Sequence, residues 1–159
     1  MTSKPFTTCL WFDNQGEEAA HYYTSIFKNS RITGLNRYTA AGPGEEGAVI
    51  TVTFELNGQR FLALNGGPEH TFNPAVSLIV ECADQAEVDY YWDRLSDGGQ
   101  EVACGWVQDR YGFSWQVVPT RFLEMISGPD QEQTARVMRA MFTMKKFDIA
   151  ELERAYAGE

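Results

Sequence analysis

The sequence is poor in the residues that mark membrane, nucleic-acid and disulfide-rich proteins. Thirteen basic residues against 22 acidic ones give a formal charge of −9, which disfavours nonspecific binding to nucleic acid or anionic membranes. No apolar run approaches the ~20 residues of a membrane span, and Met1 to Pro5 lacks the apolar region of a signal peptide. We therefore expect a cytoplasmic protein whose partners are small molecules or proteins.

Cysteine and histidine are also scarce. The three cysteines, Cys9, Cys82 and Cys104, are an odd number without a Cys-x-x-Cys pair, and each lies in or beside an apolar run. This pattern favours buried free thiols in a reducing compartment over a disulfide framework. The two histidines, His21 and His70, are expected on a helix surface and in a loop, although Glu69 with His70 could form an acid-base pair at a cleft edge.

What the sequence does contain is a repeated pattern of strands and helices. In the first half, alternating strand residues and helical periodicity predict strand, helix, strand, strand, strand over residues 6–66. Asn57-Gly58 marks a hairpin because both residues tolerate positive φ, whereas Gly42-Pro43-Gly44 joins two strands and does not fit a phosphate-binding loop.

The second half repeats this order. Asn65-Gly66-Gly67-Pro68 marks the boundary between the two halves, and residues 67–74 form a linker. Residues 75–119 carry a second strand, helix and further strands. Tyr22-Tyr23 and Tyr90-Tyr91 occupy equivalent places in the two predicted helices. We therefore expect a single 159-residue domain of the α+β class, made of two tandem β-α-β-β-β modules.

The two ends of the second module have their own signals. Asp84 is placed to cap its helix, and Cys104 to Pro119 reads as a closing hairpin in which Asp109 and Arg110 form the turn and a surface ion pair. A helical tail over residues 128–157 follows, with one helix through about Met144 and a last helix capped by Asp148.

Six segments of the sequence form a distinctive set: Leu10-Trp11-Phe12, Glu17-Glu18-Ala19-Ala20, Phe61 to Gly67, Cys104-Gly105-Trp106, Asp109 to Pro119, and Lys145 to Ile149. Together they resemble the PhnB-like family, and the resemblance extends over roughly residues 6 to 157. This family belongs to the vicinal-oxygen-chelate superfamily, the glyoxalase and bleomycin-resistance group, and many members carry the label 3-demethylubiquinone 3-methyltransferase.

The resemblance implies that the strands curl into an open, barrel-like mixed sheet around a cleft, in a homodimer. In metal-using relatives, four side chains of the two modules bind one divalent ion. Spacing from the helices and hairpins maps this quartet onto Thr7, Leu62, Ala75 and Gln116, which offer no histidine or carboxylate. We therefore expect no metal and no other cofactor.

Strand alternation predicts which side chains face the cleft. If Leu10, Phe12, Leu78 and Val80 pack against the helices, the alternate residues point the other way. The predicted cleft residues are Cys9, Trp11, Ser77, Ser114 and Gln116. This lining suits a small, partly apolar ligand, although the same residues could instead fill a core or a dimer interface. Cys9 is a poor nucleophile because no histidine or cluster of cations is placed to lower its pKa.

Three functions remain open at this point. The first is a metal-independent small-molecule-binding protein, which could also be an enzyme. The second is a methyltransferase that uses S-adenosylmethionine on a quinone precursor, as the family label says, although no glycine-rich loop of a doubly wound unit is present. The third is a non-catalytic module that sequesters its ligand, as resistance relatives do.

Overall fold

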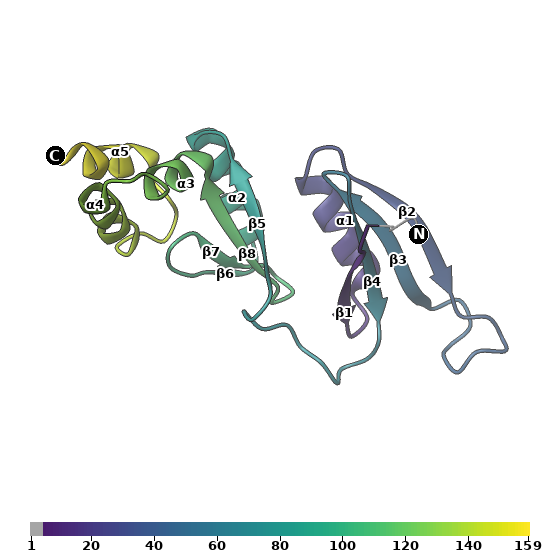
Figure 1. The fold of residues 1–159 in the computed structure, drawn as a ribbon. Helices are drawn as coiled ribbons and strands as arrows, with labels where there is room; N and C mark the ends of the chain where they lie inside the picture. Colours follow the sequence, from purple (N-terminus) through teal and green to yellow (C-terminus); the bar gives the residue numbers. More distant parts are fainter. Residues whose placement is uncertain (1–4) are drawn as a thin grey trace. The chain divides into compact units, whose positions relative to one another are not determined.

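A computed structural model describes residues 5–159 of the chain. Each half of the chain folds as a four-stranded sheet with a helix on one face (Figure 1). The first four residues, part of the segment considered above for a signal peptide, lie outside the described residues. The first half contains β1 (Thr8–Phe12), α1 (Gly16–Ile26), β2 (Arg31–Arg37), β3 (Val49–Leu56) and β4 (Gln59–Asn65). The second contains β5 (Ser77–Cys82), α2 (Gln85–Ser96), β6 (Gln100–Glu101), β7 (Trp106–Gln108) and β8 (Ser114–Pro119).

The predicted α+β class and the tandem β-α-β-β-β modules are confirmed. The described strands form two four-stranded mixed sheets instead of a closed barrel, with orders β1-β4-β3-β2 and β5-β8-β7-β6. In each sheet the first and last strands of the module pair in parallel, and the other pairs are antiparallel. The chain divides into two compact units, residues 1–71 and 72–159.

Alternation along the strands builds the core of the first unit. Leu10 and Phe12 of β1 are buried on the face that carries α1, and they are joined there by Phe54 and by Tyr23 of the helix. The tight turn between β3 and β4 is formed by Asn57-Gly58, both at positive φ (48° and 78°), as the sequence predicts.

The second unit has the same arrangement on its helical side. Val88, Trp92 and Leu95 of α2 are buried, as are Trp115 and Val117 of β8. The predicted helix cap is also present, since a carboxylate oxygen of Asp84 accepts a hydrogen bond from the Glu87 backbone N–H at 2.9 Å.

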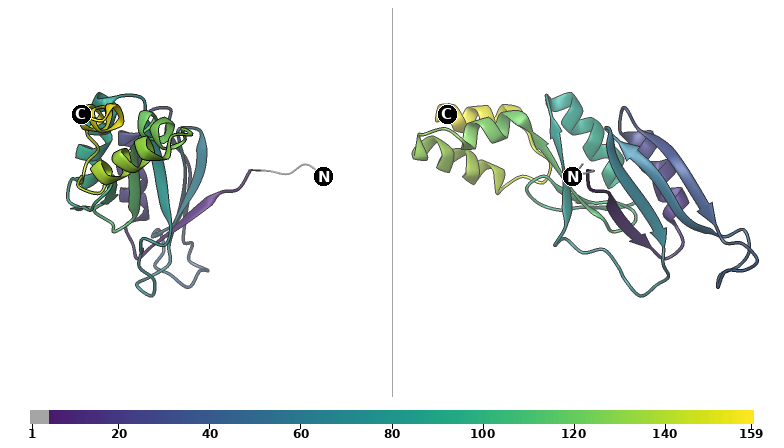
Figure 2. Two further views of the ribbon diagram at one scale, coloured as in Figure 1. Left: turned by 60° about the vertical axis from the view of Figure 1, so that its left-hand side comes forward. Right: turned by 45° about the vertical axis from the view of Figure 1, so that its right-hand side comes forward.

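Three helices follow β8 and gather beside its carboxyl end (Figure 2). They are α3 (Thr120–Ile126), α4 (Gln131–Met141) and α5 (Ile149–Ala157). Asp148 caps α5 as predicted, because it accepts from the Glu151 N–H at 3.0 Å. The prediction of one helix through Met144 was wrong at its end, because α4 stops at Met141 and two tight turns follow. Within the described part of the chain, no helix is both long and apolar enough to cross a bilayer.

Candidate functional site

The closing hairpin of the second module is built around a buried carboxylate. Asp109 is 2% exposed, and one of its oxygens accepts from the backbone N–H groups of Tyr111 at 2.9 Å and Phe113 at 3.1 Å. The other oxygen accepts from the indole N–H of Trp115 at 2.9 Å. Each hydrogen bond satisfies a donor in or beside the turn, so Asp109 is a turn-forming residue, as predicted.

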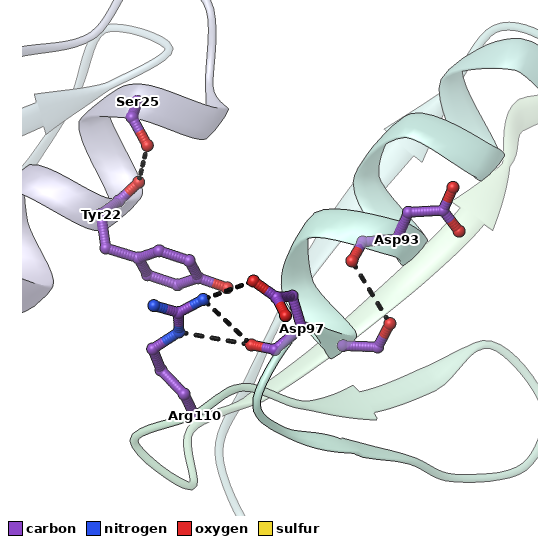
Figure 3. A network of polar contacts seen from close by, with 6 residues as sticks. Tyr22, Ser25, Asp93, Asp97 and Arg110 are labelled. Carbon is purple, nitrogen blue, oxygen red and sulfur yellow. Dashed lines mark hydrogen bonds and ion pairs between the residues drawn. The ribbon is translucent and has the colours of Figure 1, made fainter.

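The neighbouring Arg110 stays at the surface. Its guanidinium donates to the carboxylate of Asp97 at 2.7 Å and to the Asp97 carbonyl oxygen at 3.2 Å, at the carboxyl end of α2 (Figure 3). The ion pair was predicted between Arg110 and Asp109, and this was wrong: Asp109 is buried and accepts hydrogen bonds within the hairpin, whereas Arg110 pairs with Asp97. These contacts give the hairpin a structural role.

A pocket of about 650 Å³ lies on the face of the second sheet that is opposite α2. Residues paired across neighbouring strands share a sheet face, and the register places Gln116 of β8 between Ile79 of β5 and Trp106 of β7. Glu81 and Val118, the next pair along β5 and β8, also line the pocket. This face is thus apolar with a few polar side chains.

The opposite wall of the pocket comes from the helical tail. It consists of five apolar side chains, Phe122, Leu123, Met141, Phe142 and Phe147. Phe142 is 67% exposed and Ile79 of the sheet is 58% exposed, although both are large apolar residues. Exposed apolar side chains that gather at one pocket are typical of a binding surface.

Backbone contacts hold this wall against the sheet. Cys104 and Gly105, both at positive φ, donate their N–H groups to the carbonyl oxygens of Met144 at 2.9 Å and Lys145 at 2.7 Å. Gly105 packs so closely on the ring of Phe147 that a side chain at this position would overlap it. Two of the segments that carried the family resemblance, Cys104-Gly105-Trp106 and Lys145 to Ile149, therefore bind each other.

A glutamine on α2 reinforces the same junction. The side-chain amide of Gln85 donates to the Phe147 carbonyl oxygen at 3.0 Å and accepts from the Ile149 N–H at 2.9 Å. Sequence reasoning missed Gln85, because nothing in its surroundings distinguishes it from a surface residue at the start of a helix.

Of the predicted cleft residues in the second unit, Gln116 lines the pocket. Its amide donates to the hydroxyl of Ser77 at 2.9 Å, so Ser77 positions Gln116. Ser114 is 1% exposed, and its hydroxyl has no hydrogen-bond partner within residues 5–159. It does not line the pocket. Trp106 lines the pocket, and alternation along β8 could not reveal it because Trp106 belongs to β7.

The other two predicted cleft residues, Cys9 and Trp11, belong to the first unit and lie on the face of its sheet opposite α1. The indole N–H of Trp11 donates to the Gly67 carbonyl oxygen at 2.9 Å, and the Trp11 and His70 rings form a T-shaped contact with their centroids 4.9 Å apart. His70 thus packs on an aromatic ring. A cleft that combines all five predicted residues stays a prediction.

The residues at the expected metal positions do not fit a divalent ion. Leu62 and Ala75 have no donor atom, and Thr7 and Gln116 offer neutral oxygens where carboxylates or imidazoles would be expected. Across residues 5–159, no group of three or more histidine, cysteine, aspartate or glutamate side chains is placed to hold a metal. His21, the second histidine, is exposed on α1.

The three cysteines are free thiols, and the prediction that all are buried was wrong for Cys9, which is exposed, and for Cys104, which is partly exposed. Strand alternation explains Cys9, because it places this residue on the open sheet face beside buried Leu10. Burial together with the carboxylates of Glu87 and Asp84 raises the pKa of Cys82 to about 12. Partial burial also raises the pKa of Cys9, so neither of these two thiols is activated as a nucleophile.

Comparison with known proteins links the fold to one family. The family model described as 3-demethylubiquinone-9 3-methyltransferase matches residues 4–118. A structure from Bacillus cereus, described as a putative 3-demethylubiquinone-9 3-methyltransferase, PhnB protein, is 39% identical over 74% of this chain and 100% of its own, with a TM-score of 0.67. No curated protein matches the chain.

More distant structures share the fold alone. Protein PA1353 from Pseudomonas aeruginosa is 15% identical, covers 74% of this chain and 98% of its own, and has a TM-score of 0.62. The fosfomycin resistance protein FosX from Mesorhizobium loti is 10% identical over 80% of this chain and 100% of its own, with a TM-score of 0.55. The family match ends at residue 118, before α3 begins, so the tail wall of the pocket lies outside the matched region.

Proposed function

The chain belongs to the 3-demethylubiquinone-9 3-methyltransferase-like (PhnB) family, and on this basis we propose that it binds a small organic molecule in the pocket of its second unit without a metal ion. The observation that carries the proposal is the pocket of about 650 Å³ between the open face of the second sheet and the helical tail. Ligand sites are commonly clefts of about 300 to 1,000 Å³ with mostly apolar walls and a few polar groups.

The polar groups in this pocket support a role in recognition. Within the described residues, the indole N–H of Trp106 and the carboxylate of Glu81 have no hydrogen-bond partner, and Gln116 is oriented by Ser77. The pocket therefore presents a donor, a charged acceptor and a fixed amide beside aromatic rings. An apolar ligand body would pack on Trp106 while one or two of these groups fix its orientation.

Other parts of the functional proposal rest on the family. We propose that the protein is cytoplasmic and homodimeric. In an alternative version of the proposal, Cys9, Trp11 and Ser114, which do not line this pocket, form the ligand site instead, and the Trp11→Ala variant below separates the two sites. For either site, the proposal has two versions: in one the protein converts its ligand as an enzyme, and in the other it only sequesters the ligand.

A methyltransferase acting on a quinone precursor is the alternative that the family name describes. Its cofactor would be S-adenosylmethionine, which is commonly held by a glycine-rich turn between a strand and a helix of a doubly wound sheet. In this chain the Gly42-Pro43-Gly44 segment joins the antiparallel strands β2 and β3, so the fold lends this alternative no support. Saturable binding of S-adenosylmethionine in calorimetry would reverse the ranking.

The test is a thermal-shift screen of small metabolites and apolar probes against the wild type, Trp106→Ala and Trp11→Ala. A ligand at 100 times its Kd should stabilise the wild type by about 2.7 kcal/mol. Trp106→Ala should abolish the shift, whereas Trp11→Ala, which changes the other unit, should retain it. A shift lost only in Trp11→Ala would place the ligand on the first sheet and refute the pocket.

A further inference from the structure

One ionised side chain, the carboxylate of Glu81, lines the pocket, and the described lining residues include no lysine, arginine or histidine. Glu81 lies beside Val118 in the sheet register, two residues along β5 from Ile79 and on the same face. Within residues 5–159, the Glu81 side chain forms neither an ion pair nor a hydrogen bond. Its charge is therefore available to a ligand.

Three basic residues that lie close in sequence to the tail wall are paired, each with a carboxylate that does not line the pocket. The pairs are Lys145 with Glu101 at 4.0 Å, Lys146 with Asp89 at 2.7 Å and Arg121 with Glu153 at 2.6 Å. A fourth basic residue, Arg139, is exposed in the last turn of α4 and does not line the pocket. These cations therefore do not offset the charge of Glu81.

Two further features favour a positively charged ligand. The pocket walls carry four aromatic rings, those of Trp106, Phe122, Phe142 and Phe147, and aromatic faces attract organic cations. The second unit, residues 72–159, contains 15 acidic and 8 basic residues, so its formal charge is −7. The field of such a unit attracts cations and repels anions.

We propose that the pocket selects an amphipathic cation, a protonated amine or quaternary ammonium on an apolar body. The apolar body packs on Trp106 and Ile79, and the ammonium group lies at the carboxylate of Glu81. This inference rests on the proposed function and adds the chemical class of the ligand.

The test uses three probes with one carbon skeleton and different head groups: 4-phenylbutylammonium, 4-phenylbutanol and 4-phenylbutyrate. Calorimetry at low salt should show the ammonium binding about 3- to 10-fold more tightly than the alcohol, with the carboxylate weakest. The ratio should shrink in high salt because Glu81 is exposed and its field is screened.

Two charge variants locate the selectivity. Glu81→Gln should remove the advantage of the ammonium while the alcohol binds within about 2-fold of the wild type, since only the charge at the pocket is lost. Glu151→Gln removes the same charge from an exposed position on α5, outside the pocket, and should leave the advantage intact.

The possible failures are distinguishable. Equal binding of ammonium and alcohol to the wild type, or equal loss in the two charge variants, overturns the cation selectivity but retains a small-molecule pocket. If none of the three probes binds at millimolar concentration and the metabolite screen also fails, the proposed function itself is refuted.

Discussion

Replacement of Gly105 by alanine should destabilise the protein strongly, because two independent costs meet at this residue. Its φ is +79°, in the left-handed region that side chains rarely adopt. A Cβ atom there would overlap the Phe147 ring, with Cδ2 at 2.7 Å, and would lie 2.9 Å from the Val117 carbonyl oxygen. Phe147 is buried and supports the tail wall of the pocket, so it has little room to move.

The magnitude follows from these two costs. An alanine in the left-handed region costs about 1 to 2 kcal/mol. Forcing an extra methyl into a packed core adds about 1 to 3 kcal/mol. Gly112→Ala is a matched control, because Gly112 has a φ of +83° and a Cβ there would meet nothing within 4 Å. The control should therefore show the first cost alone.

Urea denaturation followed by tryptophan fluorescence measures both variants under the same conditions. Gly105→Ala should lower the free energy of unfolding by about 2 to 5 kcal/mol, against about 1 to 2 kcal/mol for Gly112→Ala. Losses that agree within about 0.5 kcal/mol would refute the close packing of Gly105 on Phe147. The Gly105 variant should also bind pocket ligands more weakly, since the tail wall must shift.

Two more predictions concern buried polar groups of the second unit. Asp109→Asn should cost about 1 to 3 kcal/mol in urea denaturation, because the buried indole N–H of Trp115 loses its acceptor; unchanged stability would contradict the hydrogen bond. At pH 8, iodoacetamide should modify Cys82 in the unfolded protein and not in the folded one, since burial raises its pKa from the ordinary 9.0 to about 12. Rapid modification of Cys82 in the folded protein would contradict this raised pKa. Because the pKa of Cys82 is raised on folding, the neutral thiol contributes its full stabilisation below pH 9, and this contribution is lost as the pH rises towards 12.

Local signals were enough to predict most of the fold. Alternation identified the buried face of β1, and the Asn57-Gly58 turn and the helix caps at Asp84 and Asp148 lie where expected. The helix α3 was not predicted, because Pro119 at its start makes no side-chain cap and its seven residues are too few to show a period.

The site was harder to predict because its walls meet only in three dimensions. Gln116 and its partner Ser77 follow from alternation, but Trp106 lines the pocket through the register of β7 against β8. That register is set by the turn that Asp109 closes, and the sequence alone did not specify how many residues the turn contains. The tail docks through backbone hydrogen bonds of Cys104, which leave no side-chain pattern to recognise.

The parallel pairing of β5 with β8 also bears on the order in which the protein folds during synthesis. These two strands are separated by the whole of α2, β6 and β7, so the second sheet is not complete until residue 119 has left the ribosome. Contacts between residues so distant in sequence form slowly. The tail wall comes later still, since Phe147 must reach Gly105. A nascent chain that lacks the tail would therefore expose the apolar floor of the pocket, and this floor is the surface on which premature association of unfinished chains would begin.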